Sequence, residues 1–359
     1  MRWFRKKRRN IVSGGVLLVS SGGLGDTILF SLVIERFTKM AIPGEDIVLI
    51  LPKESLKMRF LFDNRIIIFP VDYKAFRKNK AYVKEITGQL YQNNYRVVIS
   101  TDFLRHPKLD EVIIKSCEAN EVIAMEPRSW PKYNKALNKN IMVYTRRFNS
   151  GPIHMDKILR WAAYADWLTG EKEPPPQVRL PVGRVRDGLN YQRPTIILVP
   201  FSAVKEKQSP PEVFVTIMEY LKDGYDFIVA CAPNDLEDNP EYTDLANNPN
   251  VTFDDSLFEE LAPKLKKAKL VISADTAAMH LSVALGVPTV CLASAAYVNE
   301  IIPYAPEVTP DNVRFVYHPM TCEGCLGSCK LPTEAGRFPC VARIEITQVL
   351  RAIEDLLVK

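Results

Sequence analysis

Short apolar, β-branched runs alternate with amphipathic stretches along this chain, and the whole series occurs twice. Runs of this kind that are apolar throughout are typical of parallel strands buried on both faces, and the stretches between them have helical spacing. Two successive series of this type predict an α/β protein with two doubly wound, Rossmann-like domains. The predicted strands are Val16–Val19, Ile47–Leu51, Ile66–Phe69, Val97–Ser100, then Thr195–Val199, Phe227–Cys231, Leu270–Ser273 and Thr289–Leu292. The clearest predicted helices are Ile28–Phe37, Pro211–Leu221, Leu257–Lys267, Ala277–Leu285 and Glu345–Leu357.

The length of 359 residues suits two domains, each large enough to bury a core. A proline-rich stretch over Glu171–Pro194 separates the two series and is typical of a linker. We therefore expect a basic tail over residues 1–10, a first domain over 11–180, a linker over 181–194, and a second domain over 195–359 that includes a cysteine-rich loop over 318–341 and a terminal helix.

The net charge of +5 is concentrated at the start of the chain. Six Lys and Arg residues between Arg2 and Arg9 contribute +6, which leaves the rest of the chain at −1. Nucleic-acid binding is not expected, because it needs a broad basic surface. With Trp3 and Phe4 among them, residues 2–9 suit peripheral contact with an anionic membrane surface. A solvated tail is the alternative.

The apolar run after this tail, Ile11–Val19, is too short for a secretory signal and contains Ser13, Gly14 and Gly15. No apolar run approaches the 18 residues of a membrane span. The seven cysteines are an odd number in a long chain, which favours a reducing compartment. We therefore expect a cytoplasmic protein, with any membrane contact limited to the inner face.

The first candidate motif, Ser20–Asp26, follows the first predicted strand and includes Gly23, Leu24 and Gly25. Glycines at such a turn let the backbone approach a ligand, and the helix N-terminus attracts anions. Asp26 is alternatively a carboxylate that only caps the helix. A dinucleotide fingerprint fits poorly, because Ile28 occupies the third glycine position and Lys53 follows the second strand where a ribose-binding acid is needed.

The second candidate motif, Ser273–His280, also joins a strand to a helix. Its small residues leave backbone N–H groups free to bind a phosphate, and Asp275 and His280 suit contacts with a nucleotide or a sugar hydroxyl. A helix cap and a structural histidine are the alternatives for these two residues. Both motifs follow strands, so we expect them to face each other across a central cleft between the domains.

Four segments together resemble glycosyltransferase family 9, the heptosyltransferase family of lipopolysaccharide core synthesis. They are Gly22–Asp26, His154–Asp156, Lys207–Phe214 and, most specifically, Ser273–Ser294. The resemblance implies a GT-B fold with the acceptor mainly on the first domain and the nucleotide-sugar on the second. It implies an inverting transfer of heptose from ADP-heptose to a lipopolysaccharide-core-type acceptor.

The same resemblance implies roles for individual residues. Asp26 matches the family's catalytic base. We expect the neighbouring residues Gly23, Leu24 and Gly25 to bind the nucleotide-sugar. Lys207 matches a phosphate-side lysine and Ser202 a phosphate-contacting hydroxyl. Asp275, Thr276 and Ala277 match a diphosphate-binding helix start, and we expect His280, from its own motif, to bind the nucleotide-sugar as well. Ser209 stands where the family usually has Trp, and Lys207 alternatively belongs to a solvated charged loop.

Two further groups of residues complete the candidates. Cys322, Cys325, Cys329 and Cys340 have a spacing that suits a structural zinc or iron site, and free thiols are the alternative. Arg105 and His106 follow the fourth strand, where an acceptor is expected, and are alternatively ordinary loop charge. The chain has no D-x-D pair, so we expect no catalytic cofactor.

Three other functions stay open at this point. Protein-modifying heptosyltransferases of the same family hold iron in this region, so transfer to a protein acceptor is the main alternative. An NAD-linked oxidoreductase and a non-catalytic scaffold are the other two.

Overall fold

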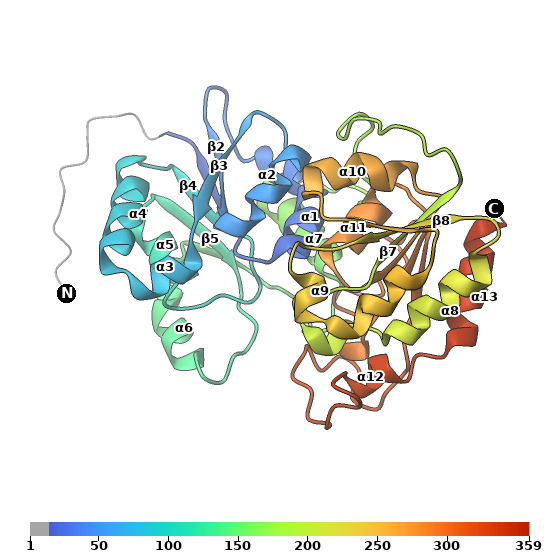
Figure 1. Ribbon diagram of the computed structural model, residues 1–359. Helices are drawn as coiled ribbons and strands as arrows, with labels where there is room; N and C mark the ends of the chain where they lie inside the picture. Colours follow the sequence, from blue (N-terminus) through green and yellow to red (C-terminus); the bar gives the residue numbers. More distant parts are fainter. Residues whose placement is uncertain (1–13, 359) are drawn as a thin grey trace. The chain divides into compact units, whose positions relative to one another are not determined.

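The computed structural model describes residues 14–358, so the tail over residues 1–10 lies outside the described residues. The chain divides into two compact units (Figure 1). The first comprises the described part of Met1–Ile153 together with Arg160–Pro174. The second comprises His154–Leu159 and the described part of Pro175–Lys359.

The first unit contains a parallel six-stranded sheet in the order β3-β2-β1-β4-β5-β6. The strand β1 lies at its centre because all four of its residues are fully buried aliphatic side chains. The strands are β1 (Val16–Val19), β2 (Ile47–Pro52), β3 (Ile66–Val71), β4 (Val97–Ser100), β5 (Glu121–Met125) and β6 (Arg146–Phe148). The helices are α1 (Leu24–Ser31), α2 (Ile34–Thr38), η1 (Lys53–Leu61), α3 (Tyr73–Lys78), α4 (Lys80–Gln92), α5 (Asp110–Ser116), α6 (Asn134–Asn140), η2 (Ile141–Val143) and α7 (Lys157–Thr169).

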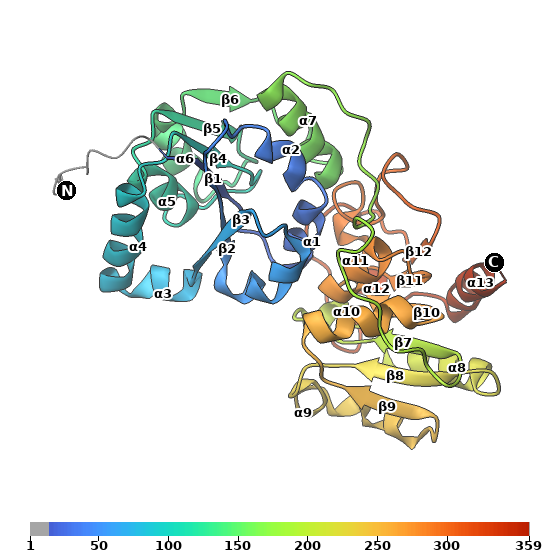
Figure 2. The ribbon, with the colours of Figure 1, turned by 90° about the horizontal axis from the view of Figure 1, so that it is seen from above.

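Helices cover both faces of this first sheet (Figure 2). On one face, α3, α4 and α5 bury apolar side chains against alternate residues of β1, such as Leu17 and Val19. On the other face, α1, α2 and α7 meet through aromatic rings, with Phe30 packed edge-on to Trp161 at 5.2 Å between ring centroids. The indole N–H of Trp161 donates to the carbonyl of Thr101 at 2.8 Å, which fixes α7 to the end of β4.

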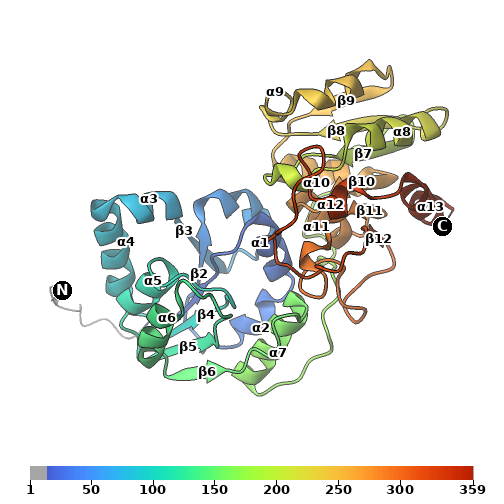
Figure 3. The ribbon, with the colours of Figure 1, turned by 90° about the horizontal axis from the view of Figure 1, so that it is seen from below.

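The second unit repeats this plan with the order β12-β11-β10-β7-β8-β9, all parallel (Figure 3). One face packs on α8, η4 and α13 around Phe214, Tyr242 and Ile353, and α11 lies over β10 and β11. The strands are β7 (Thr195–Val199), β8 (Asp226–Ala230), β9 (Val251–Asp254), β10 (Leu270–Ala274), β11 (Thr289–Leu292) and β12 (Val313–Val316). The helices are η3 (Lys205–Lys207), α8 (Pro211–Leu221), α9 (Asp235–Asp238), η4 (Pro240–Asn247), α10 (Phe258–Lys267), α11 (Ala277–Ala284), η5 (Ala295–Tyr297), α12 (Pro339–Ala342) and α13 (Ile346–Leu357).

The α/β class with two doubly wound sheets is confirmed, and all eight predicted strands are present to within two residues. The helix predicted over Ile28–Phe37 was wrong in extent, because α1 begins earlier and ends at Ser31. There the Leu32 and Val33 N–H groups bond the carbonyls three residues back, and the tightened turn separates α1 from α2. Within residues 14–358, no helix is long and apolar enough to cross a membrane.

Charged side chains are buried beside the carboxyl ends of β1 and β4. Arg105 and Glu111 form an ion pair at 3.1 Å, with side chains 2% and 1% exposed. Asp110 accepts a 2.6 Å hydrogen bond from the His106 N–H, and burial together with the nearby Asp102 carboxylate raises the pKa of Asp110 to about 7. Between these two pKa values the folded state therefore keeps a proton on Asp110, whereas in the unfolded chain the same carboxyl has its ordinary pKa of 3.8 and has lost the proton.

This buried proton predicts a specific pH dependence of stability. Because the folded state binds more protons than the unfolded state between pH 4 and pH 7, the free energy of unfolding falls as pH rises through that window. Chemical denaturation should show the wild type about 2 kcal/mol less stable at pH 8 than at pH 5 from this group. Asp110→Asn should lose that part of the slope, and an identical slope in the variant would contradict the assignment.

Candidate functional site in each Rossmann-like unit

Each sheet reverses its strand order next to its first strand, at β1 and β4 in the first unit and at β7 and β10 in the second. Ligands of doubly wound sheets bind outside the carboxyl ends of the strands at such a reversal, because the two loops there diverge to opposite faces. The loops after these four strands contain the Asp26 motif, Asp102, Lys207 and the Asp275 motif, in that order.

A buried carboxylate joins the two loops of the first unit. Asp102 Oδ2 accepts hydrogen bonds from the Ser21 N–H at 2.6 Å and from the Ser21 hydroxyl at 2.9 Å. Because Asp102 follows β4 and Ser21 follows β1, these bonds fix the glycine-containing loop to the opposite side of the strand reversal. The sequence did not reveal this contact, since 81 residues separate its partners.

Asp26 lies in the first turn of α1 and is half-buried. Its Oδ2 accepts from the Gly23 N–H at 3.0 Å, so the capping role weighed from the sequence is present in the structure. A Cβ at Gly22 would lie 2.5 Å from the Asp26 Cβ, which explains the glycine at this position. Gly23 is exposed at the N-cap, and Leu24 and Gly25 are half-buried beside it.

The two weaker candidates of the first unit separate. Arg105 faces the interior, where it pairs with Glu111 and donates to the Met125 carbonyl at 2.6 Å, so we do not include it in the proposed acceptor site. His106 is half-buried and packs at 4.6 Å from the ring of Tyr133 and at 5.7 Å from that of Trp130. Desolvation lowers the pKa of His106, and the nearby cations Arg77, Lys108 and Lys132 lower it further.

A nearly buried ion pair joins the two loops of the second unit. Lys207 Nζ lies 2.8 Å from Asp275 Oδ2, with side chains 13% and 9% exposed. The same ammonium lies 4.4 Å from the centre of the Tyr297 ring, a cation–π contact. Lys207 is therefore held on a structured element and does not belong to a solvated charged loop. Tyr297 was missed by sequence reasoning because it follows β11 on a different loop.

The N-terminus of α11 lies next to this ion pair. Thr276 is its N-cap, yet no side chain caps the helix, and the Thr276 hydroxyl is 3.3 Å from that of Ser273. Ala277 begins the helix without a bulky or charged side chain. An uncapped N-terminus with a lysine beside it favours an anion, through its N–H groups and the helix dipole. Ser202 is half-buried in the loop after β7, where its hydroxyl accepts from the Val204 N–H at 3.3 Å.

His280 is placed differently from the other donor-site candidates. It is 4% exposed on α11, and its Nδ1 lies 2.6 Å from the hydroxyl of Tyr304. Tyr304 is itself 4% exposed, so this pair lies in the interior of the second unit. The geometry corresponds to the structural histidine that the sequence left as an alternative.

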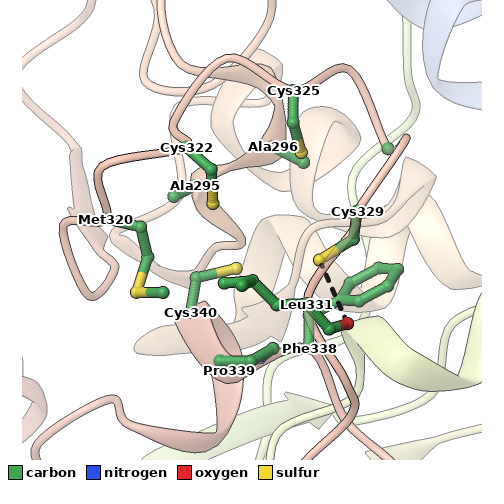
Figure 4. Close-up of a pocket in the computed structure, with 11 residues that line it drawn as sticks. Ala295, Ala296, Met320, Cys322, Cys325, Cys329, Leu331, Phe338, Pro339 and Cys340 are labelled. Atoms are coloured by element: carbon green, nitrogen blue, oxygen red, sulfur yellow. Dashed lines mark hydrogen bonds between the residues drawn. The ribbon is translucent and has the colours of Figure 1, made fainter.

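All four cysteines of the 318–341 loop line one small pocket (Figure 4). Their sulfur atoms turn toward the shared space, and Met320 and Phe338 close its sides. Burial raises the pKa of the Cys340 thiol, and Cys325 and Cys329 raise it further. Among residues 14–358, no group of three or more Cys, His, Asp or Glu side chains lies in an arrangement that could hold a metal ion.

Solved structures with the same fold include several glycosyltransferases. A family 9 glycosyltransferase from Veillonella parvula aligns with a TM-score of 0.70 at 18% identity, over 98% of this chain and 99% of that one. The E. coli heptosyltransferase WaaC, solved with ADP-2-deoxy-2-fluoro heptose, gives 0.66 at 17% identity, over 95% and 99%. The iron-containing dodecameric glycosyltransferase TibC from E. coli gives 0.54 at 13% identity, over 96% and 76%. These likenesses confirm a GT-B fold.

No curated protein matches the sequence. The model of glycosyltransferase family 9 (heptosyltransferase) matches residues 132–318, which is more than half of the chain. The match includes the Lys207 and Asp275 loops, whereas Asp26 and the four loop cysteines lie outside it. The family assignment excludes the NAD-linked oxidoreductase. This chain is a glycosyltransferase and belongs to glycosyltransferase family 9, the heptosyltransferase family.

Proposed function

We propose that this enzyme moves a heptose from ADP-heptose to a lipopolysaccharide-core-type acceptor, with inversion at the anomeric carbon. The Lys207–Asp275 pair beside the uncapped start of α11 is the observation that carries the proposal. Lys207 provides a fixed cation, and the start of α11 provides oriented N–H groups, both at the strand reversal of the second unit. This combination suits a diphosphate. The adenine base and the heptose are proposed from the family and from the ligand in the WaaC structure.

In this proposal the second unit binds the donor diphosphate. Lys207 and the first N–H groups of α11, those of Ala277 and its neighbours, would receive the phosphate oxygens, and Ser202 would add a hydroxyl. Asp275 keeps the ammonium of Lys207 in place without a ligand. Negative charge grows on the diphosphate as it leaves, so these fixed groups bind it most strongly in the transition state. No catalytic metal is needed for this step.

Asp26 is the proposed general base. The acceptor hydroxyl forms its bond to the anomeric carbon while the bond to the diphosphate breaks, and the hydroxyl proton passes to Asp26. A single displacement of this kind inverts the anomeric configuration. The loop that carries Asp26 is held by the Ser21–Asp102 hydrogen bonds, so the carboxylate has a fixed position before substrates bind.

Two classes of acceptor fit this chemistry. A lipid-linked glycan at the cytoplasmic membrane face is our main proposal, and residues 2–9, which lie outside the described residues, would then contact anionic lipid. A protein hydroxyl is the alternative, favoured by the four-cysteine pocket together with the likeness to an iron-containing glycosyltransferase. Incubation with ADP-heptose and either lipid-linked core glycan or cell protein separates the two, since only one should gain the sugar.

We also propose that Cys322, Cys325, Cys329 and Cys340 bind one structural iron or zinc ion. Four thiols that line one pocket are the right donors for a closed tetrahedral site, and binding an ion would draw them into an arrangement that they do not form in the described structure. Such an ion would order the loop and take no part in the transfer.

Elemental analysis of the purified protein tests this metal site. About one iron or zinc per chain is expected. The variants Cys322→Ser and Cys325→Ser should each lose most of this metal and should each have a lower melting temperature. Cys231→Ser is the matched control, because Cys231 follows β8 outside the loop, and it should keep the metal. Protein without either metal, or with full metal in the loop variants, would contradict the proposal.

The base assignment predicts the outcome of Asp26→Asn. The amide oxygen still accepts from the Gly23 N–H, so the melting temperature should stay unchanged. The amide cannot take the acceptor proton, and kcat should fall about 10²- to 10⁴-fold with little change in the donor KM. Kinetics that stay near wild type would remove Asp26 from the mechanism and would favour another base.

The diphosphate assignment predicts that Lys207→Met weakens binding of ADP about 10- to 100-fold, since it removes a charge-assisted contact. Lys205→Met is the matched control. It removes the same charge at a position two residues earlier, where the lysine side chain is 56% exposed. Isothermal titration of ADP should separate the two variants. Equal affinities in both would show that Lys207 does not touch the phosphates.

A further inference from the structure

The cysteine-rich loop contacts both segments that surround the Lys207 ammonium. On one side, the Gly324 N–H donates to the Ala295 carbonyl at 2.9 Å and the Leu326 N–H to that of Ala296 at 2.8 Å. The next residue is Tyr297, whose ring lies against Lys207. A Cβ at Gly327 would lie 2.9 Å from the Tyr297 hydroxyl, so the loop also packs directly on this ring.

On the other side, the loop binds the backbone on both sides of Lys207 itself. The Phe338 N–H donates to the carbonyl of Glu206 at 2.9 Å, and Arg337 Nε donates to the carbonyl of Gln208 at 3.0 Å. Arg337 is 12% exposed; its NH1 also donates to the Ala335 carbonyl at 2.8 Å, and its NH2 lies 3.9 Å from the Glu241 carboxylate. The lysine therefore sits on a three-residue segment whose two neighbouring carbonyls are both held by the loop.

These contacts help to hold the short helix η3, Lys205–Lys207, together with the ion pairs of Lys205 with Glu241 and of Lys207 with Asp275. It is one turn long and has no side-chain cap. A one-turn helix is unstable by itself, so its position depends on tertiary contacts. A lysine that is already in place when a phosphate arrives loses less side-chain and backbone freedom on binding.

We propose that Arg337 is a positioning residue for Lys207, which acts through its Nε hydrogen bond to the Gln208 carbonyl and not through its charge. This inference rests on the proposed binding of a nucleoside diphosphate by Lys207. It gives the cysteine-rich loop a second role, because the same loop that holds the four thiols also holds the phosphate-binding lysine.

Three substitutions at Arg337 separate the hydrogen bond from the charge. Arg337→Gln places an amide N–H at the position of Nε and removes the charge. Arg337→Lys keeps the charge and places a methylene at that position. Arg337→Met removes both. The matched control is Arg343→Met, which removes an arginine that is 50% exposed and pairs with Glu334 in the same region.

Titration with ADP and donor kinetics should then give a fixed pattern. Arg337→Lys and Arg337→Met should weaken ADP about tenfold and raise the donor KM by a similar factor with a smaller change in kcat. Arg337→Gln and Arg343→Met should stay within about twofold of wild type. Wild-type affinity in Arg337→Lys with weak binding in Arg337→Gln would overturn the proposal, as would wild-type affinity in all three.

A double-substitution cycle shows whether Arg337 acts through Lys207. In a Lys207→Met background, Arg337→Lys should cause no further loss of ADP affinity. Full additivity of the two losses would overturn the positioning role. Failure of Lys207→Met itself to weaken ADP would instead overturn the proposed phosphate site, so the two failures are distinguishable.

Discussion

In each sheet the strand order reverses beside the first strand, and the positions of both candidate sites follow from this reversal. At the reversal the two loops that follow the neighbouring strands diverge. In each unit one carboxylate joins these loops, through the Ser21–Asp102 hydrogen bonds in the first unit and the Lys207–Asp275 ion pair in the second. The aliphatic cores of the sheets make the edges rigid, and the polar contacts fix the loops on them. Each unit of this chain thus has one polar contact that joins the two loops.

The two sites differ in the charge they present. In the first unit the carboxylates of Asp102 and Asp110 lie close together, and the raised pKa of Asp110 relieves their repulsion by keeping one proton. In the second unit Asp275 balances Lys207, so the ammonium is stabilised while no ligand is bound. This division suits the proposed reaction, in which the first unit would receive a proton from the acceptor and the second would bind a diphosphate.

Local patterns in the sequence predicted the buried strands and the two motifs that follow them, since both depend on neighbouring residues. The strands β6, β9 and β12 were missed, because they are short edge strands with charged or polar residues, such as Arg146–Phe148. The strand β5 was missed because its apolar run is only four residues long, and periodicity does not distinguish so short a run from part of a helix. Asp102, Tyr297 and Arg337 were beyond reach because each meets its partner only through the tertiary fold.

Thermal unfolding with a panel of nucleotides tests the proposal that the second unit binds an adenine nucleotide-sugar at the Lys207–Asp275 pair. A ligand that binds only the folded state raises the melting temperature in proportion to its affinity. The melting temperature should rise with ADP, rise further with ADP-heptose, and change little with UDP, GDP or NAD. A rise with UDP or GDP in place of ADP, or with none of the nucleotides, would contradict it.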